Sequence, residues 1–241
     1  MGYGPYAVPT QARPGDPPPS YAAQGQAPAG SWAARPRENH GLGITLLVLG
    51  SLMVLGDILG AVTAPGAVAA YDAAVAEGRD PAQVVTAHDA VGLFALLLVP
   101  TWIVGSLWLS RARENAVLIA PHRVRRSAVW AWLGWLVPVV LLWFPKQIVD
   151  DSWFITSSAV RAGDPRGRYR DTRLWWGLWL VSGALSNVVW QVAIQNGDDP
   201  HQGIVPGLEV AVAIVGALAF AAWVPVVRGL SQAQTDLAHG R

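Results

Sequence analysis

The sequence contains no cysteine, which excludes disulfide frameworks, thiolate metal sites, cysteine nucleophiles and lipidation through cysteine. Charge is also scarce: 14% of the 241 residues are charged, and Lys146 is the only lysine among 17 basic residues. A formal net charge of +1 is too small for a protein that binds nucleic acid. Hydrophobic residues, by contrast, make up 52% of the chain and occur in long blocks, so most of the chain is expected inside a lipid bilayer.

The N-terminal residues 1–40 are rich in proline, glycine, alanine and glutamine. Such a segment cannot bury enough apolar surface to offset the entropy of ordering its backbone. We predict a disordered cytoplasmic tail, which serves as a tether or recruits a partner. The first apolar run begins near Gly41 and is too long for the core of a signal peptide, so we expect no cleavable signal.

Four uncharged or nearly uncharged segments are long enough to cross about 30 Å of hydrocarbon as helices, at a rise of about 1.5 Å per residue. The predicted transmembrane helices cover residues 41–64, 91–109, 174–194 and 207–227. Residues 231–241 are predicted to follow as a short cytoplasmic tail. The first connection contains an alanine-rich segment, residues 67–87, which predicts a short external helix interrupted near Gly78–Pro81.

Residues 127–149 are also apolar, but Pro138 and Pro145 interrupt them. The flanking segments 111–126 and 161–173 each carry five arginines, which is typical of cytoplasmic loops. A helix that crossed the membrane between these segments would place one of them outside. We therefore predict a re-entrant or interfacial helical hairpin that leaves and returns on the cytoplasmic side, and the alternative is a fifth transmembrane helix.

The predicted fold is thus an all-α integral membrane protein with a polytopic domain over residues 41–230. The connections around residues 65–88 and 196–206 are poor in arginine and are predicted to be external, so both termini are expected in the cytoplasm. Pro145 suits the first turn of a helix. Residues 146–160 then predict an interfacial amphipathic helix, with Val149 and Trp153 on one face.

One carboxylate, Asp57, lies within the first predicted transmembrane helix. A charged group at that depth is costly and indicates a functional site. Asn187 and Gln191, one turn apart in a later helix, would complete a polar pathway if all three side chains met in one cavity. This hypothesis predicts a small transporter or channel. The alternative is close helix packing, because Gly56 and Gly60 are spaced four residues apart beside Asp57.

Two adjacent pairs of residues were weighed as metal ligands. His88 and Asp89 diverge around a helix, and the preferred interpretation is a helix N-cap at Asp89. Asp150 and Asp151 lack a second acidic motif in a suitable place. The sequence also contains no nucleophile, zinc-protease or phosphate-loop motif, so it predicts no catalytic residue, no metal and no cofactor, and an enzyme is the least favoured class.

A set of motifs follows the second predicted helix. They are R-A-R-x-N-A from Arg111, a tryptophan-rich element that ends in G-W-x-V-P at Pro138, L-W-x-P ending at Pro145, and D-x-W from Asp151. With these motifs the chain resembles the actinobacterial membrane proteins catalogued as domain of unknown function 4328, over roughly residues 41–235. The resemblance implies a plasma-membrane location and assigns no activity. The family commonly has asparagine before L-W-x-P, where this chain differs.

Leu141 occupies that asparagine position, which removes any polar role there. We predict a non-enzymatic multispan protein whose cytoplasmic surface, rich in arginine and tryptophan, contacts anionic lipid headgroups, a protein partner or a second copy of the chain. The neighbouring arginines Arg123, Arg125 and Arg126 would fix the topology and attract such headgroups. The residues predicted to shape this surface are Arg111, Arg113, Asn115, Trp135, Pro138, Trp143, Pro145, Lys146, Asp151 and Trp153.

Overall fold

Helices dominate the part of the chain that the computed structural model describes, which is residues 35–160, 171–195 and 205–240. No strand occurs in these residues, and the all-α class is confirmed. Residues 1–34, which make up most of the predicted disordered tail, lie outside the described residues. Residues 161–170, which carry four arginines of the second arginine-rich connection, also lie outside them.

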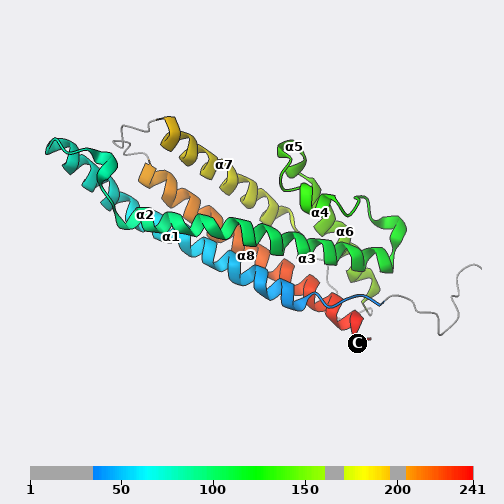
Figure 1. Ribbon diagram of the computed structural model, residues 1–241. Helices are drawn as coiled ribbons and strands as arrows, with labels where there is room; N and C mark the ends of the chain where they lie inside the picture. The colour runs from blue at the N-terminus through cyan, green and yellow to red at the C-terminus, as the bar shows by residue number, and fades with distance from the viewer. Residues whose placement is uncertain (1–34, 161–170, 196–204, 241) are drawn as a thin grey trace, which may run out of the picture. The chain divides into compact units, whose positions relative to one another are not determined.

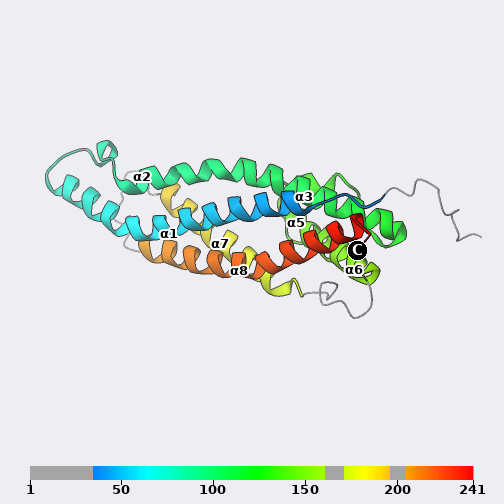
Figure 2. The ribbon, with the colours of Figure 1, turned by 90° about the horizontal axis from the view of Figure 1, so that it is seen from below.

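Four long helices alternate in direction (Figures 1 and 2). They are α1 (His40–Ala76), α3 (Leu98–Ile119), α7 (Arg173–Gln195) and α8 (Val205–Ala238). α8 packs against α1 and α7, and α3 packs against α1. The start of α1, the end of α3, the start of α7 and the end of α8 therefore lie toward one end, called the basic end below, and their other termini lie toward the opposite end.

The first helix is longer than predicted, because α1 continues through Pro65 to Ala76. Proline removes one backbone donor, but the alanine-rich residues after it favour the helix strongly. α1 ends two residues before Gly78, whose φ of 68° only glycine adopts readily. There the Gly78 and Arg79 amides donate to the carbonyls of Val75 and Ala74, which closes the helix end.

The second helical rod consists of three pieces, α2 (Ala87–Val91), the 3-10 helix η3 (Gly92–Leu97) and α3. The change of helix type precedes Pro100, whose ring clashes with the carbonyl four residues earlier and which lacks a donor for it. α3 then continues to Ile119, so Arg111 and Arg113 lie on a helix. The arginine pattern alone had predicted a loop for these residues.

The predicted hairpin region contains only short helices. η4 (Pro121–Arg123) is followed by α4 (Trp130–Leu133) and α5 (Pro138–Leu141), of four residues each. A helix of four residues rises about 6 Å, far less than a bilayer is thick. The ring of Trp132 makes an edge contact with Trp102 of α3, and Trp135 makes one with Trp179 of α7. The segment therefore packs between α3 and α7.

α6 (Phe144–Ala159) begins with Pro145 in its first turn, as predicted, but it is not a helix lying free on a surface. Ile148, Val149 and Trp153 are buried against α3 and α8. Asp151, which was predicted to shape the cytoplasmic surface, is buried too. The reason is an ion-pair partner, Arg125, that comes from the preceding segment.

α8 extends beyond the predicted helix, because residues 231–238 continue it and do not form a separate tail. Ser231 and Gln234 are buried there. Among the described residues, three helices are long and apolar enough to cross a membrane: α1, the rod from Ala87 to Ile119, and α8 from Pro206. α7 is not one of these three helices.

Candidate functional site

A buried polar network at the basic end joins four parts of the chain, and Gln234 of α8 is its centre. The Gln234 carbonyl accepts from Asn39 Nδ2 at 3.2 Å and from Asn115 Nδ2 at 3.1 Å. Its amide nitrogen donates to the Ala112 carbonyl of α3 at 3.0 Å and to Thr156 Oγ1 of α6 at 3.2 Å. Gln234, Asn39 and Asn115 are fully buried, so the amides do not exchange partners with water.

The same network holds the segment that enters α1. Asn115 Oδ1 accepts from the Arg37 amide at 2.7 Å, and Asn115 Nδ2 donates to the Arg37 carbonyl at 2.8 Å. Asn39 Nδ2 also donates to the Trp108 carbonyl. At the end of the chain, His239 Nε2 lies 2.8 Å from Glu38 Oε1. The backbone of residues 37–39 is therefore fixed to α3 and α8.

These contacts correct part of the predicted surface. Asn115, Pro145, Asp151 and Trp153 are buried, because they pack or hydrogen-bond within the protein. They support the surface from below and do not form it. The predicted residues that keep partial or full exposure are Arg111, Arg113, Trp135, Pro138, Trp143 and Lys146.

Arg125 and Asp151 form the most extensive ion pair of the basic end. The guanidinium donates to Asp151 Oδ1 through Nη2 at 2.6 Å and through Nε at 2.9 Å, and the Arg125 amide donates to Oδ2 at 3.1 Å. The side-chain hydrogen bonds to Asp151 raise the pKa of Arg125 above its already high value, so the guanidinium stays charged. The pair fastens the segment after η4 to α6.

Asp150, the neighbour of Asp151, is engaged as well. Its Oδ2 lies 2.5 Å from Lys146 Nζ, one turn earlier on α6, and its Oδ1 accepts from the Thr172 hydroxyl just before α7. Both adjacent carboxylates thus have protein partners. Among the described residues, no group of three or more metal-ligating side chains lies together. The structure gives the Asp150–Asp151 pair a role in joining segments.

The surface of α4, α5 and the turns around them is apolar. Its exposed side chains are Val129, Leu133, Leu136, Val137, Val139, Leu142 and Trp143. Arginines border this surface: Arg126 lies over the Phe144 ring at 3.8 Å from its centre, and its Nε donates to Gln147 Oε1. The Arg123 side chain is exposed and makes no hydrogen bond or ion pair with the described residues. An apolar face bordered by cations suits the boundary between headgroups and acyl chains.

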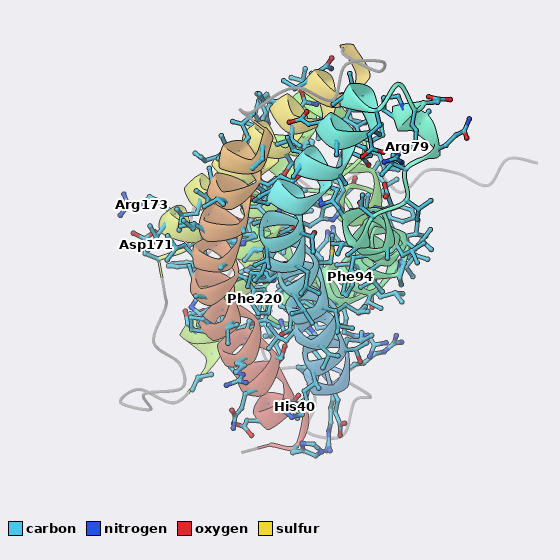
Figure 3. The ribbon with its side chains drawn as sticks, turned by 90° about the vertical axis from the view of Figure 1, so that its left-hand side faces the viewer. His40, Arg79, Phe94, Asp171, Arg173 and Phe220 are labelled. Carbon is cyan, nitrogen blue, oxygen red and sulfur yellow. The ribbon has the colours of Figure 1, made fainter. Side chains whose placement is uncertain are left out.

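Basic residues are distributed unevenly between the two ends. Arg79 lies after the end of α1, at the opposite end from His40 (Figure 3). It is paired with Glu77 at 2.7 Å, so its charge is locally neutralised. The other described basic residues lie in or beside the segments that meet at the basic end: Arg35, Arg37, Arg111, Arg113, Arg123, Arg125, Arg126, Lys146, Arg173 and Arg228.

The polar residues predicted within the membrane do not form one site. Asp57 is half-buried, close to Gly216 of α8 and Ser182 of α7. Asn187 and Gln191 are exposed on α7. At about 100° per residue they point about 140° and about 180° away from Ser182, because α7 is a regular helix. The expectation that they converge with Asp57 is therefore wrong.

Other residues lie near Asp57 toward the opposite end, and the sequence analysis did not group them with it. His88 Nε2 lies 3.4 Å from Glu209 Oε1 of α8, and Thr63 Oγ1 lies 3.1 Å from His88 Nδ1. Gly60 makes room for the Glu209 carboxylate. Thr63, His88 and Glu209 are 25 or more positions apart in the chain, so no local motif reveals the cluster. A search for every carboxylate inside an apolar segment would have found Glu209.

The neighbouring residue Asp89 has the capping role that the sequence suggested, at a different position. Thr86 is the N-cap of α2, and Asp89 is the third residue of the helix. The Thr86 amide donates to Asp89 Oδ2 at 2.6 Å, which is the return contact of a capping box.

The comparisons with known proteins give a family and no close relative. No curated protein and no solved structure matches the chain. The sequence pattern of one family, described as Domain of unknown function (DUF4328), matches residues 68–232, which is more than half of the 241 residues, and the chain therefore belongs to this family.

Proposed function

We propose that this chain is a non-enzymatic, four-span protein of the plasma membrane whose cytoplasmic basic end contacts anionic lipid headgroups. The observation that carries the proposal is the apolar surface of α4 and α5 bordered by arginines, next to the starts and ends of long apolar helices. Both described chain ends, near Arg35 and Gly240, belong to the same end of the helices.

The fourth span in this proposal is α7. Its 23 residues rise about 35 Å, enough to cross the hydrocarbon layer. Tryptophans stand near both of its ends, Trp175 and Trp176 at the start and Trp190 toward the finish, as in interfacial belts. The alternation of the four long helices then keeps every arginine-rich segment on one side.

The hairpin is proposed to dip into the cytoplasmic leaflet without crossing it. Trp176 Nε1 donates to the Leu142 carbonyl at 3.0 Å, so the turn before α6 has a protein partner for a backbone group that lipid could not satisfy. The outward leucines and valines of α4 and α5 would lie among acyl chains. Arg123 and Arg126 would lie at headgroup level.

Topology is tested with single cysteines, for which the cysteine-free chain is a clean background. Ala76, Ser158 and Gly207 are each replaced in turn, and intact cells are treated with a membrane-impermeant maleimide. We expect labelling at Ala76 and Gly207 and protection at Ser158 until the cells are lysed. Labelling at Ser158 with protection at Gly207 would mean that the hairpin region crosses the membrane.

Lipid contact is tested by native mass spectrometry of the purified full chain in neutral detergent. We expect phosphatidylglycerol to be retained in preference to phosphatidylcholine, and less of it in Arg123→Gln. Arg79→Gln is the matched control, because Arg79 lies at the opposite end and is paired with Glu77. Equal retention of both lipids, or equal loss in both variants, contradicts lipid contact at the hairpin.

A second candidate function is ion-coupled transport, favoured by the cluster of Asp57, Glu209 and His88. Two carboxylates inside apolar helices are expensive unless they are used. In reconstituted vesicles with a pH gradient, Glu209→Gln would abolish a proton flux that Glu77→Gln leaves intact. A flux that is absent from the wild-type protein removes this candidate.

A further inference from the structure

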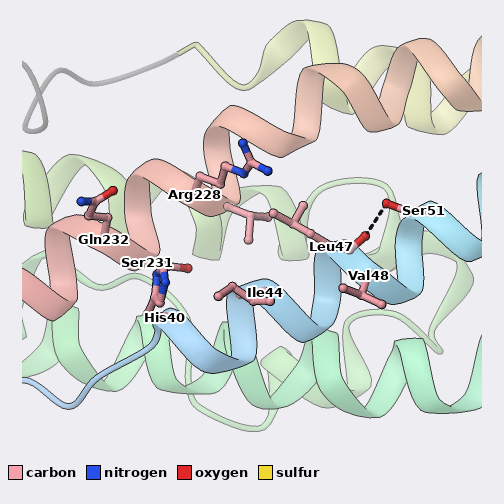
Figure 4. A pocket seen from close by; sticks show the side chains of 10 residues that line it. His40, Ile44, Leu47, Val48, Ser51, Arg228, Ser231 and Gln232 are labelled. Atoms are coloured by element: carbon pink, nitrogen blue, oxygen red, sulfur yellow. Dashed lines mark hydrogen bonds between the residues drawn. The ribbon is translucent and has the colours of Figure 1, made fainter.

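A groove lies between α1 and α8 on the basic-end half of these helices (Figure 4). Its volume is about 420 Å³, within the range of ligand pockets. Its α1 wall is formed by one face of the helix, with Ile44 and Val48 half-exposed. Its α8 wall is formed by Val227, Arg228 and neighbouring residues. The groove is separate from the hairpin and is not part of its surface.

The geometry of the groove follows from a close helix contact. Gly43 faces Ser231, and any side chain at position 43 would collide with the Ser231 hydroxyl. That hydroxyl accepts from Trp108 Nε1 at 2.8 Å, so the floor of the groove is fixed from behind by α3. The helices are therefore held together below the groove.

The length of the groove corresponds to one leaflet. It runs along α1 from His40 to Ser51, a rise of about 16 Å, which is about half of the hydrocarbon thickness. The Ser51 hydroxyl, at the far end, donates to the Leu47 carbonyl of its own helix at 2.8 Å and leaves no free donor there. Most of the groove is therefore suited to a hydrocarbon chain.

Polar groups gather at the other end. His40, Ser231 and Gln232 lie at that end, and Arg228 lies on the α8 side a little farther along the groove (Figure 4). Arg228 is exposed and makes no hydrogen bond or ion pair with the described residues. None of the described residues that line the groove is acidic. A guanidinium without a protein partner, at the mouth of an apolar groove, matches a phosphate joined to an acyl chain.

We propose that this groove binds one diacyl phospholipid with an anionic headgroup, its phosphate on Arg228 and His40 and one acyl chain along Ile44 and Val48. The inference rests on the proposed membrane orientation, but it assigns a separate, built site. Binding in the groove requires the anionic headgroup and an acyl chain at once, whereas contact at the hairpin requires only the headgroup. A headgroup without chains, or a neutral phospholipid, provides only one part.

The test measures the dissociation constant of the tightest phosphatidylglycerol by native mass spectrometry of the full chain in neutral detergent. We expect Arg228→Gln to weaken that binding about tenfold or more, because a charge-assisted contact to phosphate is lost. Ile44→Trp, which keeps Arg228 and fills the groove, should weaken it as well. Arg79→Gln is the control, and far-UV circular dichroism with gel filtration verifies that each variant folds.

The outcomes separate this inference from the proposed function. Loss in Arg228→Gln and Ile44→Trp supports the groove, with or without a loss in Arg123→Gln, which reports on the hairpin. Loss in Arg123→Gln alone overturns the groove and leaves hairpin contact standing. If Ile44→Trp binds like the wild type, or if glycerophosphoglycerol competes as well as the intact lipid, no acyl chain occupies the groove and the inference is wrong.

Discussion

Gln234 makes four hydrogen bonds inside the protein, and Asn39, Asn115, Ala112 and Thr156 provide the partners. Leucine has a similar size but would leave one N–H of each asparagine amide without its acceptor, because the other N–H donates to Trp108 or Arg37. An unsatisfied buried polar group costs about 1–3 kcal/mol. We therefore expect Gln234→Leu to lower the free energy of unfolding by about 2–4 kcal/mol, measured by thermal denaturation in detergent.

Gln232 provides the control for this substitution. It lies two residues earlier on α8 and is exposed, so Gln232→Leu should leave the unfolding midpoint nearly unchanged. Similar losses in the two variants would mean that the network does not stabilise the basic end.

Gly229 is required by the contact between α8 and α6. A Cβ at this position would collide with the ring of Trp153, which is buried and has no room to move away. We expect Gly229→Ala to destabilise the protein by about 1–3 kcal/mol, the usual cost of overpacking. Gly177→Ala on α7 is the matched control, because nothing lies within 4 Å of a Cβ there. Thermal denaturation that ranks the two variants equally would contradict the close contact.

The contacts between side chains far apart in the chain were the least predictable part of the site. Asn115 and Gln234 are 119 positions apart, and Arg125 and Asp151 are 26 apart. The sequence marks such residues as polar but does not say which side chain each one meets. Asp151 was predicted to shape the cytoplasmic surface for that reason. Likewise, Glu209 was overlooked because one carboxylate near a helix start does not disturb an apolar segment.

At the scale of elements, the Arg125–Asp151 pair fastens the segment after η4 to α6. The two ends of the pair are not equivalent, because the Asp151 side chain is 9% exposed and that of Arg125 is 56% exposed. Removing Arg125 leaves a buried carboxylate without its main partner, whereas removing Asp151 leaves an arginine that water can solvate.

We expect Arg125→Ala to lower the free energy of unfolding by about 1–3 kcal/mol. Asp151→Ala should lower it by about 1 kcal/mol, because water can solvate the exposed arginine that remains. Chemical denaturation in mixed micelles measures both. The reverse order would show that the Asp151 carboxylate is solvated without Arg125.

Helix positions were easier to predict than helix limits. Long apolar segments predicted α1, α3 and α8, because hydropathy over many residues is a strong signal. The ends of these helices differ from the predicted ends, because tertiary contacts extend a helix past the point where its hydropathy falls. Residues 231–238 are polar enough to resemble a tail, yet Gln234 and Ser231 hold them against α3. Pro65 resembled a boundary, yet the alanines after it keep α1 helical.

At the scale of the whole molecule, the entry to α1 is fixed by residues 37–39. Arg37 is paired with Asn115 through its backbone, and Asn39 is paired with Gln234. We expect deletion of residues 2–34 to leave the unfolding midpoint in detergent unchanged. Deletion of residues 2–39 should destabilise the protein by about 2–4 kcal/mol, because buried amide groups lose their partners. Equal midpoints for the two deletions would mean that these contacts do not form.

Glu38 and His239 meet at 2.8 Å, so the two ends of the described helical unit are neighbours. A circularly permuted chain therefore needs only a short linker between these ends. Opening it at the exposed turn around Gly78 would keep every long helix whole, since α1 ends before that turn. In the proposed orientation, the permuted protein would carry its new termini on the external side of the membrane, so the same bundle could display a fused reporter outside the cell.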